Sequence, residues 1–126
     1  MAEFNVTDFI KRSFGDTQIF GDLTTTGSIT ASGDVTAFSD SRLKKNIVDM
    51  GNTLPQVVKL RGVHYQDTDS EKQKLGMIAQ ELEEVYPELV VEVNGYKTIN
   101  YSLFSVVLLE AIKEQQKQIE ELKKQI

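Results

Sequence analysis

The chain has 126 residues, a net charge of −5 at pH 7 and no cysteine, and 40% of its residues are hydrophobic. This composition suits one or two small folded units, and the missing thiols exclude disulfides and thiolate metal sites. Acidic residues are spread along the chain, and no apolar run is long enough to cross a bilayer. We therefore expect neither a nucleic-acid partner nor a membrane partner.

A six-residue repeat occupies residues 21–38, in the copies GDLTTT, GSITAS and GDVTAF, after a degenerate first copy over 15–20. Because six is even, an extended chain places Leu23, Ile29 and Val35 on one face. One aliphatic residue per repeat is too little to bury alone, so such a ribbon gains a core by pairing with other chains. We expect residues 1–38 to be a fragment of a three-chain shaft, a triple-stranded β-helix or β-prism. The alternative is a polar linker rich in Thr and Gly.

From residue 39 a basic segment replaces the repeat, and we expect a second domain, of the α+β class, over residues 39–126. The elements expected in its first half are a helix over 52–60, a strand over 62–66, a polar loop over 67–74 and a helix over 79–86. Asn52 or Thr53 serves as the N-cap of the first helix, and Pro87 ends the second. Strand segments over 89–93 and 96–101 then flank Asn94-Gly95, which predicts a hairpin with a type I′ turn.

A long helix over 102–126 is predicted to end the chain, since this segment is rich in Glu, Gln, Lys and Leu. Its apolar positions alternate in four-three spacing, with Gln115 in the one interrupted place: Leu108, Ile112, Ile119, Leu122 and Ile126. This spacing predicts a coiled-coil seam with Ile at a and Leu at d, a pattern that by itself favours two strands, so the three-fold expectation rests on other grounds. The 106–112 end is apolar on more than one stripe, and we expect it to pack on its own domain.

Few residues are candidates for chemistry. His64 has no second histidine or cysteine with which to share a metal, and the acidic loop at Asp67, Asp69 and Glu71 lacks the glycine and terminal glutamate of a calcium loop. We therefore expect no metal and no cofactor. Ser39 and Lys44 lie five residues apart and are a candidate Ser–Lys dyad, in which a neutral lysine accepts the hydroxyl proton. Spacing alone is weak support, and a solvated basic loop is the default interpretation.

Residues 39–47, SDSRLKKNI, closely resemble the opening motif of the endosialidase-type intramolecular chaperone family, which occurs at the C-termini of phage tail spikes and fibres and in myelin regulatory factor proteins. Two further segments resemble the family in the same order. The first is GMIAQE at 76–81 with VYPEL at 85–89, and the second runs from Tyr101 to AIKE at 111–114. The three segments lie in order within residues 39–126, the range that the resemblance spans.

The resemblance implies a homotrimer that directs folding of its own upstream shaft and then cuts itself off, as a single-turnover serine peptidase. Carried onto this chain, it makes Ser39 the nucleophile, Lys44 the base and Ser39-Asp40 the scissile bond. Ser41 is the competing serine, at a variable position of the motif. No cofactor, metal or small-molecule substrate is implied. The shaft part would belong to the tail of a phage virion made in the bacterial cytoplasm, and the chaperone part would be released.

Ring size constrains this chemistry. Attack of Ser39 on its own carbonyl closes a four-membered ring, whereas attack on the carbonyl of Phe38 closes a five-membered one. Either Ser39 of one chain attacks a neighbouring chain, or the acyl shift occurs at Phe38-Ser39. Both routes stay open from the sequence.

Three other functions compete with self-cleavage. The first is a non-cleaving fibre tip that contacts a host receptor. The second is a passive trimerisation module in which the dyad is vestigial. A DNA-binding regulator of the myelin type is the least favoured, because no DNA-binding domain precedes the motif in this chain.

Overall fold

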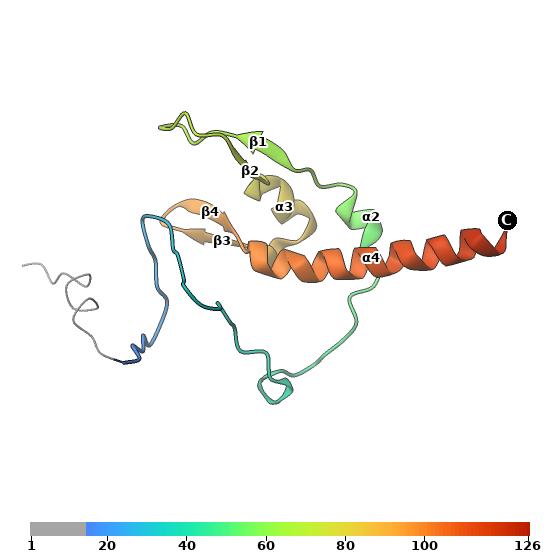
Figure 1. The fold of residues 1–126 in the computed structure, drawn as a ribbon, viewed down its shortest axis with the longest axis horizontal. Helices are drawn as coiled ribbons and strands as arrows, with labels where there is room; N and C mark the ends of the chain where they lie inside the picture. Colours follow the sequence, from blue (N-terminus) through green and yellow to red (C-terminus); the bar gives the residue numbers. More distant parts are fainter. Residues whose placement is uncertain (1–14) are drawn as a thin grey trace, which may run out of the picture. The chain divides into compact units, whose positions relative to one another are not determined.

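A computed structural model describes residues 15–126 of the chain, which divides into two units, Met1–Lys45 and Asn46–Ile126 (Figure 1). In the first unit, residues 15–38 form neither helix nor strand, and Leu23, Ile29 and Val35 are all exposed. A single chain therefore leaves the aliphatic face of the repeat largely exposed. The three-chain shaft stays a prediction, as does a domain boundary at residues 38 and 39. The part of the expected shaft fragment before residue 15 lies outside the described residues.

The second unit is a small α+β structure with two small sheets and a long C-terminal helix, as the α+β expectation stated. Its elements are α2 (Leu54–Val57), β1 (Val63–Tyr65), β2 (Lys74–Gly76), α3 (Ala79–Val85), the 3-10 turn η2 (Pro87–Leu89), β3 (Val90–Val93), β4 (Tyr96–Ile99) and α4 (Tyr101–Lys124). In the part of the chain that is described, no helix has the length and apolar character needed to span a membrane.

The predicted hairpin is confirmed as the antiparallel pair β3–β4, in which Val90 lies opposite Ile99 and Val93 opposite Tyr96. At its turn Asn94 and Gly95 have φ angles of 52° and 82°, the left-handed conformations that a type I′ turn requires. The Asn100 side chain then accepts the backbone N–H of Leu103 at 3.1 Å and caps α4. A two-residue turn and a side-chain cap thus place the helix directly after the sheet.

A second antiparallel pair, β1–β2, brings His64 opposite Leu75. The sequence predicted the first of these strands but not its pairing. Its connecting loop is held by an ion pair between Lys74 and Asp67 and by the Gln66 side chain, which donates to the carbonyl of Glu71 at 2.8 Å. Within residues 15–126, no cluster of histidine and carboxylate side chains is arranged to hold a metal ion. His64 is exposed on its strand.

The hydrophobic core lies where α3, η2 and α4 meet. Its buried apolar residues are Leu82, Tyr86, Leu89, Val107 and Ala111. The expectation that the 106–112 end of the last helix packs on its own domain is thus correct for one face of that segment. So small a core leaves many large apolar side chains on the surface of the described chain, and exposed apolar surface of this extent is typical of interaction sites.

The short helix α2 is anchored to α4 by a side chain rather than by its own N-cap. Thr53 occupies the predicted cap position and is almost fully buried, but its hydroxyl makes no capping bond to the helix. Instead the carboxylate of Glu114 on α4 accepts the backbone N–H groups of Thr53 and Leu54. A carboxylate at a helix N-terminus satisfies donors that have no partner inside the helix.

Candidate functional site

The candidate cleavage segment contains one turn of 3-10 helix, η1 (Ser41–Leu43), in the first unit. Asp40 is its N-cap, and the backbone N–H of Leu43 donates to the Asp40 carbonyl at 3.0 Å. At the other end, the backbone N–H of Lys44 donates to the carbonyl of Ser41 at 3.1 Å. The turn therefore separates the proposed nucleophile, Ser39, from the proposed base, Lys44.

Asp40 and Arg42 form a closed hydrogen-bonded pair beside the predicted scissile bond. One carboxylate oxygen of Asp40 accepts the Arg42 backbone N–H at 2.9 Å and Nε at 3.0 Å, and the other accepts the guanidinium NH2 group at 3.0 Å. The side-chain bonds from Arg42 lower the pKa of Asp40, and the backbone bond adds to this effect. Asp40 is therefore ionised at neutral pH and holds the turn that follows the bond.

Ser39 and Lys44 are both exposed in the single chain. Among the residues described, no hydrogen bond joins the Ser39 hydroxyl to the Lys44 ammonium group. A lysine acts as a base only when it is neutral, a state that burial and neighbouring cations favour. Arg42, a cation two residues before Lys44, is paired with Asp40. A dyad would thus require surroundings that the single chain does not provide, and these site residues stay a prediction.

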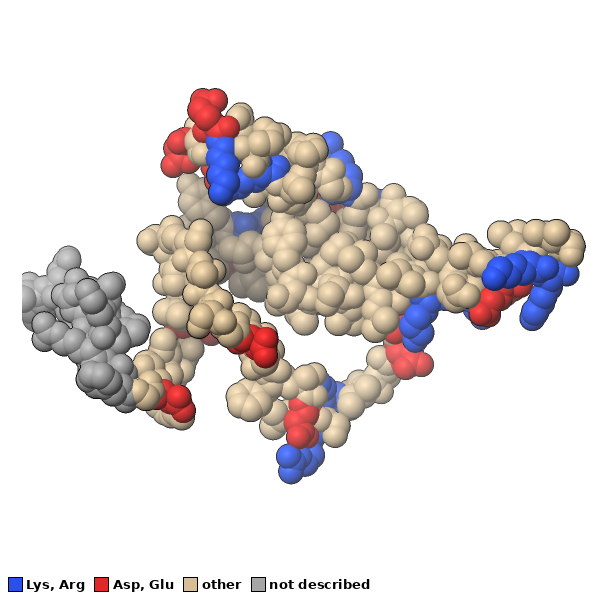
Figure 2. Space-filling view, in the orientation of Figure 1, with Lys and Arg blue, Asp and Glu red and all other residues tan. Residues whose placement is uncertain are grey.

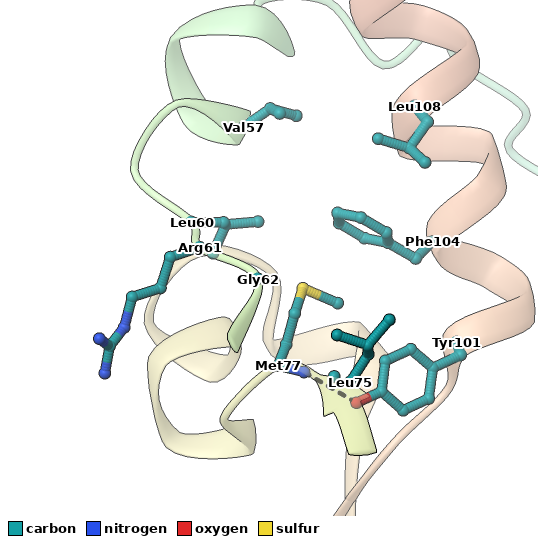
Figure 3. Close-up of a pocket in the computed structure, with 10 residues that line it drawn as sticks. Val57, Leu60, Arg61, Gly62, Leu75, Met77, Tyr101, Phe104 and Leu108 are labelled. Carbon is teal, nitrogen blue, oxygen red and sulfur yellow. Dashed lines mark hydrogen bonds between the residues drawn. The ribbon is translucent and has the colours of Figure 1, made fainter. Parts of the chain in front are cut away.

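The second unit carries an open apolar groove between α2, β2 and α4, with a volume of about 440 Å³. We call it the α2–α4 groove. Its principal lining side chains are Val57, Leu60, Leu75, Met77, Phe104 and Leu108. Figure 3 shows Val57 and Leu60 on one wall facing Phe104 and Leu108 on the other, while Arg61 turns outward. Arg61 forms an ion pair with Glu81 at 2.8 Å, so the Arg61 charge at the rim is neutralised by a carboxylate that lies outside the groove.

One end of the groove is closed by the Tyr101 hydroxyl, which accepts the backbone N–H of Met77 at 2.9 Å (Figure 3). This contact depends on Gly76. A Cβ at that position would lie 2.6 Å from the Tyr101 oxygen and 3.1 Å from a ring carbon of Tyr65. The absence of a side chain at Gly76 therefore lets the first turn of α4 approach β2.

The predicted coiled-coil positions lie on α4 and are exposed in the single chain. This stripe, the α4 seam, consists of Leu108, Ile112, Gln115, Ile119, Leu122 and Ile126. Its first member, Leu108, also lines the α2–α4 groove, so the groove and the seam adjoin and form one surface that is mostly apolar, with Gln115 as the polar member of the seam. Figure 2 shows a broad uncharged area over the first half of α4, with charged side chains gathered toward the outer end of the helix.

Three residues with clear structural roles were not singled out by sequence reasoning: Glu114, Gly76 and Tyr101. Each lies in a segment that carried the family resemblance, GMIAQE or the closing helix. Their roles are to cap α2, to permit a close approach and to bond Met77. The signal was therefore present as a pattern, while its physical meaning depends on contacts between segments distant in the sequence.

Comparison with known proteins identifies a family for this chain. Residues 39–91 match the family described as chaperone of endosialidase. Long tail fiber protein Gp37 of Enterobacteria phage M1 and its counterpart in Enterobacteria phage Ox2 are each 39% identical to the chain over 96 residues, which cover 68% of this chain. The chain spans 38% of the length of each of these relatives. This protein thus carries a domain of the chaperone of endosialidase family, and its relatives include phage long tail fibre proteins.

Proposed function

We propose that this chain acts as a trimeric intramolecular chaperone at the end of a phage tail fibre, where it aligns the preceding shaft and then releases itself by cleavage near Ser39-Asp40. The observation that carries the proposal is the mostly apolar surface of the α2–α4 groove and the α4 seam, which a single chain leaves uncovered. Family membership and the tail fibre relatives support the chaperone role.

The repeat over residues 21–38 gives a physical reason for such a chaperone. A ribbon with one aliphatic residue per six can pair with its neighbours in several registers that differ by one repeat and bury similar apolar groups. Association of three chains also costs entropy before a thin core forms. A domain that assembles first fixes the register and raises the local concentration of the shaft strands.

Cleavage would follow assembly. The Ser39 hydroxyl attacks a carbonyl carbon, Lys44 accepts the hydroxyl proton, and the released amine takes up a proton as the peptide bond breaks. Water then hydrolyses the resulting ester, so the net reaction consumes one water per bond. Because neither side chain is buried or paired with the other in the single chain, assembly provides the step that brings them together. Removal of the chaperone part would leave a shaft whose stability is kinetic.

Intact mass of the expressed chain tests cleavage directly. We expect the wild type to give a fragment that begins at Asp40 or Ser39, and Ser39→Ala to remain whole. Lys44→Ala is expected to cleave about 10²- to 10⁴-fold more slowly, the usual loss on removing a general base. The matched controls Ser41→Ala and Lys45→Ala are expected to cleave like the wild type.

Two outcomes would redirect the proposal. A wild-type chain that assembles but stays whole would favour the passive trimerisation module or the receptor-binding fibre tip. A chain that sediments as a monomer at all concentrations in the ultracentrifuge would remove the chaperone role as stated.

A further inference from the structure

The two flanks of the α4 seam differ in what they face. The heptad is set by its a positions, which are Ile112, Ile119 and Ile126. The g positions on one flank of the seam are then Phe104, Ala111 and Gln118. The e positions on the other flank are Leu109, Gln116 and Lys123. On the g flank, Ala111 is buried against its own domain and Phe104 lines the α2–α4 groove. The g flank of each helix therefore carries the domain and its open groove, while the e flank turns away from them.

Leu109 is the exception on the e flank. The two later e positions are Gln116 and Lys123, as expected for positions that border a seam in water. Leu109 is apolar and 54% exposed, belongs neither to the core nor to the seam, and lies level with the part of α4 that borders the groove. Within residues 15–126, packing of the single chain does not account for a leucine exposed at this position.

Cyclic symmetry supplies such a partner. In a ring of parallel helices each contact is heterologous, so the e flank of one chain meets the g flank of the next. Leu109 of one copy then faces Phe104 of its neighbour, beside the neighbour's open groove. Beyond Glu114 the seam extends past the groove, and there the e positions are polar.

We propose that the Leu109 side chain of each copy inserts into the α2–α4 groove of the next copy around a closed trimer. The occupant of the groove is thus a second copy of this chain. Insertion contacts Phe104 and Leu108 on α4 together with Val57 and Leu60 on the opposite wall, so the neighbour bridges the two walls of the groove. This inference rests on the proposed trimer and adds to it a side contact that makes the groove part of the assembly interface.

The first test compares two exposed apolar residues of α4 in the Ser39→Ala background, which keeps the chain whole. Leu109→Gln introduces the residue found one heptad later, and Val106→Gln changes a side chain of similar exposure, 45%, that lies outside the seam and both flanks. We expect the Leu109→Gln trimer to dissociate already at a protein concentration about tenfold or more above that at which its parent dissociates, because the burial of one leucine is lost. Val106→Gln is expected to dissociate like its parent.

The second test uses the absence of cysteine from the chain. In the double variant Leu109→Cys with Leu60→Cys, each copy carries one cysteine on the inserting flank and one in the groove. Treatment with a short bismaleimide is expected to give covalent dimers and trimers on a denaturing gel. The control pair Val106→Cys with Leu60→Cys is expected to remain at the mass of a single chain.

The results separate this inference from the proposed function. A monomeric parent chain would overturn both. A trimeric parent would leave the proposed function in place while overturning the inference if Leu109→Gln dissociates no more readily than Val106→Gln, or if the Leu109→Cys pair cross-links no better than its control. Circular dichroism of both glutamine variants serves as the control for retention of the fold.

Discussion

The carboxylate of Glu114 accepts the backbone N–H of Thr53 at 2.8 Å, across 61 residues of sequence. The same carboxylate accepts the N–H of Leu54, so one side chain on α4 takes both free donors at the start of α2. Thr53 itself is almost fully buried. Because α2 forms one wall of the α2–α4 groove, this contact ties that wall to α4 at the start of the helix.

Glu114→Ala is therefore expected to destabilise the second unit by about 1–3 kcal/mol, since it leaves partly buried backbone donors without an acceptor. Glu114→Gln retains one carbonyl oxygen and should lose less. Urea unfolding followed by circular dichroism measures both effects, with Glu121→Ala, an exposed change on the same helix, as the control. Equal stability of Glu114→Ala and Glu121→Ala would show that the cap contributes nothing.

Gly76→Ala is expected to destabilise the unit by about 1–3 kcal/mol, because its methyl group would lie 2.6 Å from the Tyr101 oxygen and force α4 and β2 apart. Gly62→Ala is the matched control, since a Cβ there meets nothing within 4 Å. Thermal unfolding of both variants provides the comparison. The double variant Gly76→Ala with Tyr101→Phe removes the clashing oxygen. Its loss of stability should therefore be smaller than the sum of the losses caused by the two single changes. Strict additivity would count against the clash as the cause.

The pH dependence of the cleavage segment follows from Asp40. Its pKa in the folded chain is lowered from the ordinary value of 3.8, chiefly by the Arg42 side chain. A lowered carboxyl pKa stabilises the turn above the unfolded-state pKa, and this contribution is lost as the pH falls through the folded-state pKa. An NMR titration of the Asp40 carboxyl should therefore give a value below 3.8, and Arg42→Gln should raise it. Lys45→Gln, which removes a nearby cation that does not contact Asp40, should leave the pKa of Asp40 unchanged.

Elements set by local chemistry were predictable from the sequence. The β3–β4 hairpin follows from Asn94-Gly95, whose positive φ angles only a few residue types adopt readily. The long helix α4 follows from its composition and spacing, and its observed start at Tyr101 differs by one residue from the prediction. The first helix was predicted over 52–60 but is regular only over Leu54–Val57, because its start depends on Glu114 rather than on the Thr53 side chain.

Contacts between distant segments were not predictable. The pairing of β1 with β2 lacks a short turn signal, since an eight-residue loop separates Tyr65 from Lys74. The approach of Tyr101 to Gly76 requires α4 to be already placed against β2. For the candidate dyad the limit is different: Ser39 and Lys44 are both exposed in the single chain, which shows no surroundings that would make the lysine neutral.

Co-expression of two impaired variants decides whether the dyad is shared between chains. Ser39→Ala retains the base and Lys44→Ala retains the nucleophile, so no chain of a mixed trimer carries both groups. If Ser39 of one copy works with Lys44 of another, mixed trimers should release cleaved product faster than Lys44→Ala alone, while Ser39→Ala alone stays whole. A mass tag on one variant identifies which chain is cut. The four-membered ring that excludes attack of Ser39 on its own carbonyl favours this outcome when the fragment begins at Asp40. A fragment that begins at Ser39, with no product from mixed trimers, would instead assign the acyl shift to Phe38-Ser39 within one chain.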